Sequence, residues 1–358
     1  PSSRRGDGEA DLKFVFSVVK DISKFLKKGK KQLVITKSTV PVGTGKKIQD
    51  IICELRPELI NNKDYFVSSN PEFLREGSAI EDFMRPDRVV CGVTDKKAED
   101  TLKELYRPLN LREAPVLFTD IESAEIIKYA SNAFLALKVS FINEIANLCE
   151  KTGGNVQMVA KGMGLDNRIG PKFLHPGPGF GGSCFPKDTR ALYASFKKNK
   201  IKNTLVKSVI NFNEDRKISI VNKIKNLLKP NIKNKVIAFL GVTFKPNTDD
   251  LRESPSLEII PRLRKLGVKI HAHDPAFNSE FVKIKEFDKV KWYGNVLDAM
   301  KNADLLVIHT EWNEYRGLDL LKVKKELKNP IILDLRNIFN IDDMKKFNIK
   351  YYGIGFKS

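Results

Sequence analysis

Residues 121–151 have the sequence "IESAEIIKYASNAFLALKVSFINEIANLCEK", and this stretch decides how the chain is organised. It predicts one long helix, which Gly153 and Gly154 end. On either side, strand-like segments alternate with helix-like segments, a pattern that favours mostly parallel sheets with helices on both faces. We therefore expect an α/β region, then an all-α region, then a second α/β region.

The expected elements on both sides follow from hydrophobic spacing and turn residues. Before the long helix, we expect a helix in residues 11–26, a strand, turn and helix in 31–48, and strands in 64–73 and 85–93. After it, we expect helices around 190–196 and 209–228 and a second strand–helix series from Asn234. The domain boundaries are accordingly placed at 1–120, 121–215 and 216–358: two Rossmann-like parallel-sheet domains joined by a central helical domain.

Composition narrows the class of protein. The chain of 358 residues has a net charge of +19, with 41% hydrophobic and 30% charged residues, which is typical of globular proteins. No apolar run approaches a membrane span, and four cysteines without a CxxC pair indicate neither a disulfide framework nor structural zinc. We expect a reducing, cytoplasmic location. Because the lysines are spread along the chain, a solvated surface is preferred to nucleic-acid binding, and an anionic small molecule is a third possible partner.

The loop "HPGPGFGGSCFPKD", residues 175–188, surrounds one cysteine with glycine and proline. Gly181, Gly182 and Ser183 leave space for a close approach of backbone to a ligand. If a helix begins after Cys184, its N-terminus and a nearby cation both favour the thiolate. The local sequence leaves two interpretations open: a nucleophile, or a tight loop whose cysteine fills space. The other cysteines, Cys53, Cys91 and Cys149, are expected to be packed core thiols.

Five motifs carry a resemblance to a known family. They are "KSTVPVGTG", "SNPEFLREGSAIEDFMRPDRVV", "YASNAFLALKVSFINEIANLCE", "GFGGSCFPKD" and "GVTFKPNTDDLRESPS". Together, in this order over most of the chain, they resemble the UDP-glucose/GDP-mannose dehydrogenase family, most closely its UDP-glucose 6-dehydrogenase branch. In that family, segments like "GDGEADL", residues 6–12, lie well inside the first domain. Since no GxGxxG follows a strand, we expect the first domain to be truncated, with its glycine fingerprint and acidic ribose-binding residue preceding Pro1.

The resemblance implies a four-electron oxidation of UDP-glucose to UDP-glucuronate with two NAD. It implies that Cys184 is the nucleophile, which holds the aldehyde as a thiohemiacetal and then as a thioester until water releases the acid. It also implies that Lys128 and Asn132, four apart on the long helix, bind the reacting oxygen and help to move its proton. Without the resemblance, an exposed polar pair is the preferred interpretation of Lys128 and Asn132.

Three further catalytic roles are implied by the family motifs. Asp188 matches the aspartate of the catalytic water network, Glu72 the glutamate that assists thioester hydrolysis, and Thr39 the threonine that helps to place that water. The alternatives are a turn carboxylate for Glu72 and an ordinary strand-end residue for Thr39.

Binding residues are carried over in the same way. The expected UDP-glucose contacts are Phe73, Leu74, Arg168, Phe180, Gly181, Phe244, Lys245 and Arg336. The expected NAD contacts are Ser38, Glu76, Lys187 and Arg252. Cations near the diphosphate would offset its charge. Arg168 resembles an arginine that reaches the sugar of the neighbouring subunit, which implies a homodimer through the central helical domain.

Two histidine positions and several rival functions complete the expectations. His175 stands where related enzymes carry a lysine, which puts one substrate contact in doubt. His271 and His273 form an HxH on one strand face, but no other ligand cluster accompanies them, so no metal site is expected. The rival functions are a sibling enzyme acting on a UDP-N-acetylhexosamine or GDP-mannose, a nucleotide-sugar-binding fragment without turnover, and a nucleic-acid binder. Neither a membrane nor a nucleic acid is expected as a partner.

Overall fold

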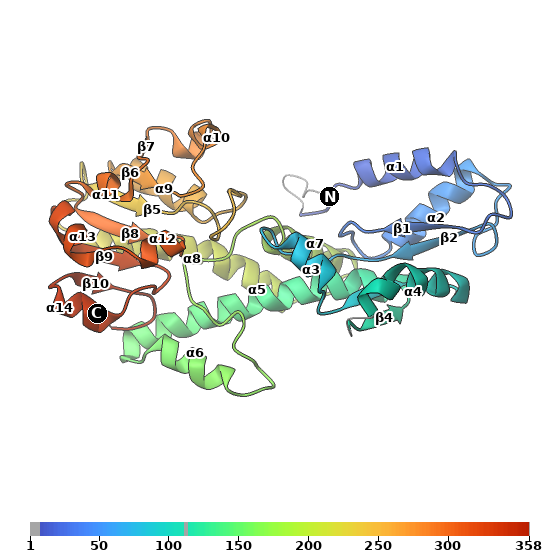
Figure 1. Cartoon of the computed structure of the whole chain (residues 1–358), viewed down its shortest axis with the longest axis horizontal. Helices are drawn as coiled ribbons and strands as arrows, with labels where there is room; N and C mark the ends of the chain where they lie inside the picture. Colours follow the sequence, from blue (N-terminus) through green and yellow to red (C-terminus); the bar gives the residue numbers. More distant parts are fainter. Residues whose placement is uncertain (1–7, 111–113, 358) are drawn as a thin grey trace. The chain divides into compact units, whose positions relative to one another are not determined.

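A computed structural model describes residues 8–110 and 114–357 (Figure 1). The chain divides into two compact units. Unit 1 contains the described residues up to Phe134 together with Lys187–Val206, and unit 2 contains Leu135–Pro186 and the described residues from Lys207 onward. The three-domain boundaries drawn from the sequence stay a prediction.

Unit 1 is built on a mixed sheet with the strand order β1-β2-β3-β4 in its described part. Its strands are β1 (Gln32–Thr36), β2 (Tyr65–Ser69), β3 (Val89–Gly92) and β4 (Val116–Thr119). The pairs β1–β2 and β3–β4 are parallel, whereas β2 and β3 meet antiparallel at Ser69 and Gly92. The helices that begin in this unit are α1 (Lys13–Ser23), α2 (Thr44–Leu55), α3 (Ala79–Met84), α4 (Lys96–Asn110) and α5 (Ile121–Thr152).

A carboxylate from α5 organises the start of α2. Gly43 has a φ of +86°, and the backbone N–H groups of Gly43 and Gly45 donate to Glu125 at 2.7 and 2.8 Å. These N–H groups belong to a helix N-terminus, where intrahelical acceptors are missing. A Cβ on Gly45 would lie 2.4 Å from Ile121 Cγ2, so glycine is required for α5 to pack this closely against α2.

Unit 2 contains an all-parallel sheet with the order β10-β9-β8-β5-β6-β7 in the part that the structure describes. Its strands are β5 (Val236–Leu240), β6 (Lys269–His273), β7 (Lys291–Trp292), β8 (Leu305–Ile308), β9 (Ile331–Asp334) and β10 (Lys350–Tyr352). The central strands β5 and β8 are almost wholly buried apolar residues, as expected where helices cover both faces of a parallel sheet.

In its described part, unit 2 contains residues 135–152 of α5 and all or part of three further helices. They are α6 (Val156–Gly164), α7 (Phe185–Lys198), which continues into unit 1, and α8 (Leu205–Leu227), most of which lies in unit 2. The shorter helices around the sheet are α9 (Ser256–Lys265), α10 (Ser279–Val282), η1 (Lys285–Phe287), α11 (Val296–Met300), α12 (Asn313–Arg316), α13 (Leu320–Glu326) and α14 (Ile341–Lys346).

The expected fold class is confirmed: Rossmann-like regions with parallel pairing flank a long helix. The long helix was placed correctly at 121–151, but α6 was not anticipated. Asn155 begins α6 by accepting the N–H of Gln157 at 2.9 Å, a capping signal that follows Gly154 directly.

One expectation about the cysteines is wrong. Cys91 and Cys149 are buried as expected, whereas Cys53 is exposed. Ile48 and Ile52 form the buried face of α2, and a residue one position after Ile52 is rotated by about 100° away from that face. Apolar neighbours in sequence are therefore a poor guide to burial on a helix.

Candidate functional site

In unit 1, α5 presents a buried lysine to the segment that follows β2. The Lys128 side chain is 3% exposed, and its Nζ lies 3.5 Å from Glu72 Oε1 and 5.1 Å from the centroid of the Phe73 ring. Glu72 Oε2 also accepts the backbone N–H of Leu74 at 2.7 Å, which orients the carboxylate. A buried ammonium needs such partners, since desolvation of an unmatched charge is costly. The structure thus brings Glu72, Phe73, Leu74 and Lys128 together.

Arg88 is a member of this group that sequence reasoning missed. Its Cζ lies 3.9 Å from the centroid of the Phe73 ring, and its Nη2 donates to Ser131 Oγ on α5 at 3.5 Å. Cations are attracted to the face of an aromatic ring. Arg88 lies in the family motif "RPDRVV", and this position in the sequence could have marked it as a candidate site residue.

The second group of unit 1 surrounds a fully buried carboxylate on α7. Asp188 is 0% exposed and accepts a hydrogen bond from Asn132 Nδ2 at 2.6 Å. Lys187 pairs with the other oxygen of the same carboxylate. Burial raises the pKa of the neighbouring Tyr129, and the Asp188 and Glu125 charges add to this effect. The ammonium of Lys187, an expected NAD contact, is therefore paired with the carboxylate of Asp188.

The alternative view of Lys128 and Asn132 as an exposed pair is wrong, because both are buried in unit 1. Burial on the same helix gives each a different partner: a carboxylate from the segment after β2 for Lys128, and a carboxylate from α7 for Asn132. An ammonium and an amide so placed can stabilise negative charge on an oxygen and donate to it.

The remaining predicted residues of unit 1 follow β1 and β2. Ser38 is exposed and Thr39 is buried, both just beyond the carboxyl end of β1, and Glu76 is partly buried. Ligands of open α/β sheets bind beside the carboxyl ends of strands, and hydroxyl and carboxylate groups are the usual partners of a dinucleotide's phosphates and ribose. The donor chemistry of this edge therefore fits NAD.

In unit 2, the glycines ahead of Cys184 are packed against another loop of the same unit. A Cβ on Gly181 would lie 2.5 Å from the Glu253 carbonyl oxygen, and one on Gly182 would lie 2.7 Å from the Phe244 ring. The Gly182 N–H donates to the Arg252 carbonyl at 2.8 Å. The chain itself therefore occupies the space that a Cβ would take at both glycines, and the expected approach of a ligand to their backbone stays a prediction.

Cys184 is half-buried and immediately precedes α7. Its Sγ lies 3.5 Å from Ser183 Oγ. The next residue, Phe185, packs its ring edge-to-face on Phe180 with 6.0 Å between centroids. A thiol at the start of a helix lies where the free N–H groups and the helix dipole stabilise negative charge. The condition set by the sequence, a helix that begins after the cysteine, is met.

Two of the predicted substrate-binding residues, Lys245 and Arg336, lie close to Phe244. Arg336 Nη2 donates to the Phe244 carbonyl at 3.3 Å, and Lys245 Nζ lies 5.4 Å from the centroid of the Phe244 ring. Arg336 Nε also donates to the His309 carbonyl at 2.8 Å and lies 3.0 Å from Glu311 Oε2. The structure therefore gathers Phe180, Gly181, Phe244, Lys245 and Arg336 in one region of unit 2.

Two predicted arginines make different contacts. Arg252 pairs its guanidinium with Asp250 at 2.9 Å and is 65% exposed. Arg168 pairs with Asp166 at 2.6 Å, in the loop after α6, and is 88% exposed. Ion pairs on the surface contribute little stability, so neither pair by itself fixes the position of its arginine strongly.

The HxH residues lie on β6. His273 is buried with its Nδ1 3.1 Å from the Tyr315 hydroxyl, and burial lowers its pKa. Over residues 8–110 and 114–357, no group of three or more His, Cys, Asp or Glu side chains has an arrangement that could hold a metal ion.

Comparison with known families decides the membership of this chain. Three sequence models of the UDP-glucose/GDP-mannose dehydrogenase family match it in order: the NAD binding domain over residues 1–110, the central domain over 122–215 and the UDP binding domain over 238–341. The chain belongs to this family. Because the NAD binding domain is matched from residue 1, the expected lack of the start of that domain is not borne out.

Relatives within the UDP-glucose/GDP-mannose dehydrogenase family are similar over almost the whole chain. A UDP-glucose 6-dehydrogenase of Rhizobium meliloti is 48% identical over 99% of this chain and 79% of its own length. The UDP-glucose 6-dehydrogenase TuaD of Bacillus subtilis is 46% identical over 97% of this chain and 73% of its own length. A UDP-glucose dehydrogenase structure from Pyrobaculum islandicum aligns with a TM-score of 0.87 at 34% identity, covering 99% of this chain and 78% of that one.

A dehydrogenase structure that is named for a different sugar is also similar to this chain. The NDP-N-acetyl-D-galactosaminuronic acid dehydrogenase of Methanosarcina mazei aligns with a TM-score of 0.86 at 26% identity, covering 100% of this chain and 76% of that one. The fold is thus shared among enzymes named for different sugars. In the described part of the chain, none of the helices combines the length and apolar character that crossing a membrane requires.

Proposed function

We propose that this protein oxidises UDP-glucose to UDP-glucuronate in two NAD-dependent steps. The observation that carries the proposal is Cys184, half-buried at the start of α7, with the buried Asp188 in the first turn of the same helix. The names of the relatives at 48% and 46% identity support UDP-glucose as the substrate.

The first oxidation needs a group that stabilises the C6 oxygen as its proton and a hydride leave. NAD, when bound, accepts one hydride in each oxidation. Lys128, with its charge held between Glu72 and the Phe73 ring, stabilises the alkoxide, and Asn132 donates a hydrogen bond to the same oxygen. Ser38, Glu76 and Lys187 are the residues of unit 1 that would hold the cofactor.

The second oxidation passes through a covalent intermediate. The Cys184 thiolate adds to the aldehyde carbon and forms a C–S bond, which retains the aldehyde as a thiohemiacetal. The thiohemiacetal then loses its hydroxyl proton and a second hydride, and this leaves a thioester. Water, held by Asp188 and Thr39 and activated with the help of Glu72, attacks the carbonyl carbon. The C–S bond breaks, the thiolate leaves, and the carboxylate is released.

The substrate's diphosphate and base are assigned to unit 2. Lys245 and Arg336 supply positive charge beside Phe244, which suits an anionic nucleotide. The Methanosarcina mazei protein, which is named an NDP-N-acetyl-D-galactosaminuronic acid dehydrogenase, shares this architecture, so a sibling activity is the alternative. UDP-glucose is preferred here because of the higher identity to enzymes named for it.

The test combines turnover with binding. The purified protein is incubated with UDP-glucose and NAD, and both NADH and UDP-glucuronate are quantified, with UDP-N-acetylglucosamine and GDP-mannose as comparison substrates. Cys184→Ala is expected to abolish acid formation while calorimetric binding of UDP-glucose persists. Normal acid formation by Cys184→Ala would refute the covalent mechanism, and preference for another nucleotide sugar would favour a sibling activity.

We also propose that the protein forms a homodimer through α5 and α6. Large apolar side chains are exposed on these helices in unit 2: Phe141 at 43%, Leu148 at 58% and Met158 at 62%. Leu165, in the following turn, is 76% exposed. Exposed large apolar side chains that gather on one surface are typical of association sites, which supports this proposal. Arg168 lies in the same loop as Leu165 and is exposed enough to reach a second subunit.

A further inference from the structure

The loop before Cys184 is held by side chains rather than by a sheet or helix. Asn213, on α8 and 4% exposed, binds both backbone groups of Phe180. The Phe180 N–H donates to Asn213 Oδ1 at 2.8 Å, and Asn213 Nδ2 donates to the Phe180 carbonyl at 3.1 Å. Gly179 has a φ of +119°, and a Cβ there would lie 2.8 Å from Asn213 Oδ1. Only glycine at 179 lets the amide approach this closely.

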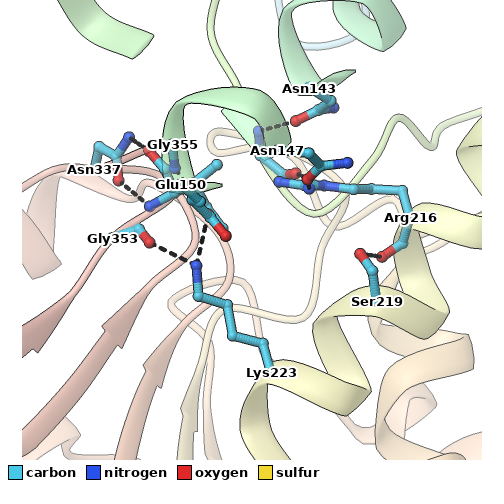
Figure 2. A network of polar contacts seen from close by, with 11 residues as sticks. Asn143, Asn147, Glu150, Arg216, Ser219, Lys223, Asn337, Gly353 and Gly355 are labelled. Carbon is cyan, nitrogen blue, oxygen red and sulfur yellow. Dashed lines mark hydrogen bonds and ion pairs between the residues drawn. The ribbon is translucent and has the colours of Figure 1, made fainter. Parts of the chain in front are cut away.

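A second residue of the loop is held in the same manner. The Gly177 N–H donates to Asn143 Oδ1 on α5 at 2.8 Å, and Arg216 Nε on α8 donates to the Gly177 carbonyl at 2.9 Å. Arg216 is itself oriented by Nη1, which donates to Asn147 Oδ1 at 2.5 Å. Figure 2 shows Asn143, Asn147 and Arg216 converging from the two helices.

These contacts determine the conformation of the loop. Buried peptide groups must find partners, because an unsatisfied one costs as much as a lost hydrogen bond. Gly177 and Phe180 are both buried, and each has its N–H and its carbonyl satisfied only while the helix side chains keep their positions.

Ring packing makes the position of Cys184 depend on the position of Phe180. The Phe180 ring contacts Phe185, the residue that follows Cys184, and both rings belong to one apolar cluster with Val209 of α8. A shift of Phe180 would therefore displace the start of α7. Misplacement of a reacting group by about 1 Å can cost roughly 100-fold in rate.

We propose that Asn143, Asn213 and Arg216 are positioning residues, which hold the loop 177–182 so that Cys184 is aligned before the nucleotide sugar binds. This inference rests on the proposed nucleophilic role of Cys184. It assigns a function in the reaction to three buried polar side chains that do not belong to the reacting or binding groups described above.

The matched control is Lys223→Ala, on the same helix as Asn213. Lys223 Nζ pairs with Glu150 at 2.7 Å and donates to the Gly353 carbonyl at 2.9 Å, so it joins α5 and α8 to the C-terminal loop instead of to the glycine loop (Figure 2). Its loss should destabilise the same pair of helices while the contacts of Gly177 and Phe180 remain.

The experiment measures kcat, KM, Tm and hydrogen exchange of the peptide that contains residues 177–182 in the full chain. Asn213→Ala is expected to lower kcat by roughly 100-fold with little change in KM. It should also accelerate exchange in that peptide by at least about tenfold, the equivalent of one lost hydrogen bond. Lys223→Ala is expected to lower Tm but to keep kcat close to wild type.

Equal kcat values for Asn213→Ala and Lys223→Ala would overturn the inference. If Asn213→Ala does not fold, Asn143→Ala is compared with Asn143→Asp instead. Because Asp retains an acceptor for the Gly177 N–H, Asn143→Asp should have a higher kcat than Asn143→Ala. Equal kcat values for these two variants would overturn the inference. A wild-type protein that does not oxidise UDP-glucose would refute the proposed function instead, whatever the exchange rates.

Discussion

Glu125 is a buried carboxylate whose titration should be visible in the stability of unit 1. It is 2% exposed and accepts the N–H groups of Gly43 and Gly45 at the start of α2. Burial raises its pKa to about 7 from an ordinary value of 4.5, against the opposing effect of the backbone hydrogen bonds. In the folded protein the neutral acid is therefore favoured at pH values where the unfolded chain is already ionised.

The direction of the pH effect follows from proton binding. Between pH 4.5 and about 7 the folded state retains a proton on Glu125 that the unfolded state has lost, so the free energy of unfolding falls as the pH rises. The contribution is fully present below 4.5 and is lost above about 7. For one proton, the free energy of unfolding changes by about 1.4 kcal/mol per pH unit. Over the interval from 4.5 to about 7, it therefore falls by about 3 kcal/mol.

The assay is urea unfolding of wild type and Glu125→Gln across this pH range. Gln stays neutral, and its single acceptor oxygen adds a constant offset of about 1–3 kcal/mol. The wild-type free energy of unfolding minus that of the variant is expected to fall by about 3 kcal/mol between about pH 4.5 and pH 8. Glu54→Gln, an exposed change on α2 whose charge is not among the causes of the Glu125 shift, is the control. If Glu125→Gln and wild type keep a constant difference over the whole range, the reasoning is refuted.

The other predictions concern the reaction and the assembly. Lys128→Ala should lower kcat by about 100- to 1,000-fold with UDP-glucose affinity nearly unchanged in calorimetry, and an effect confined to affinity would contradict its role at the alkoxide. Asp188→Asn should lower the free energy of unfolding by about 1–3 kcal/mol in thermal denaturation, since Lys187 loses its partner, whereas an unchanged Tm would show that the pair is energetically silent. The double variant Phe141→Asp, Leu148→Asp should sediment as a monomer, and a persistent dimer would place the interface elsewhere.

Much of the fold was predictable because it is encoded locally. The helical spacing of apolar residues continues from Ile121 to Thr152, over many turns, and so favours a helix over the two-residue alternation of a strand. The strands of unit 2 are short runs of β-branched and other apolar residues bounded by turn residues, which suits a parallel sheet buried on both faces. The position of Cys184 before a helix was also readable, since glycine, proline and the following charged turn mark the boundary.

Burial and side-chain partners were less predictable. Cys53 has apolar neighbours but faces solvent, and α6 is short enough that its pattern was missed. Lys128 and Asn132 were equally compatible with an exposed pair, because helical spacing places residues on one face without telling what covers that face.

The sequence by itself therefore determined the order of α/β and α regions, the long helix and the cysteine loop with its motif. Only the tertiary structure decided which groups meet across large sequence separations: Glu125 with Gly43, Asn132 with Asp188, and Asn213 with Phe180. The physical reason is that local periodicity depends on neighbouring residues. A buried donor or acceptor instead takes whichever partner the packing of distant elements brings within hydrogen-bonding distance.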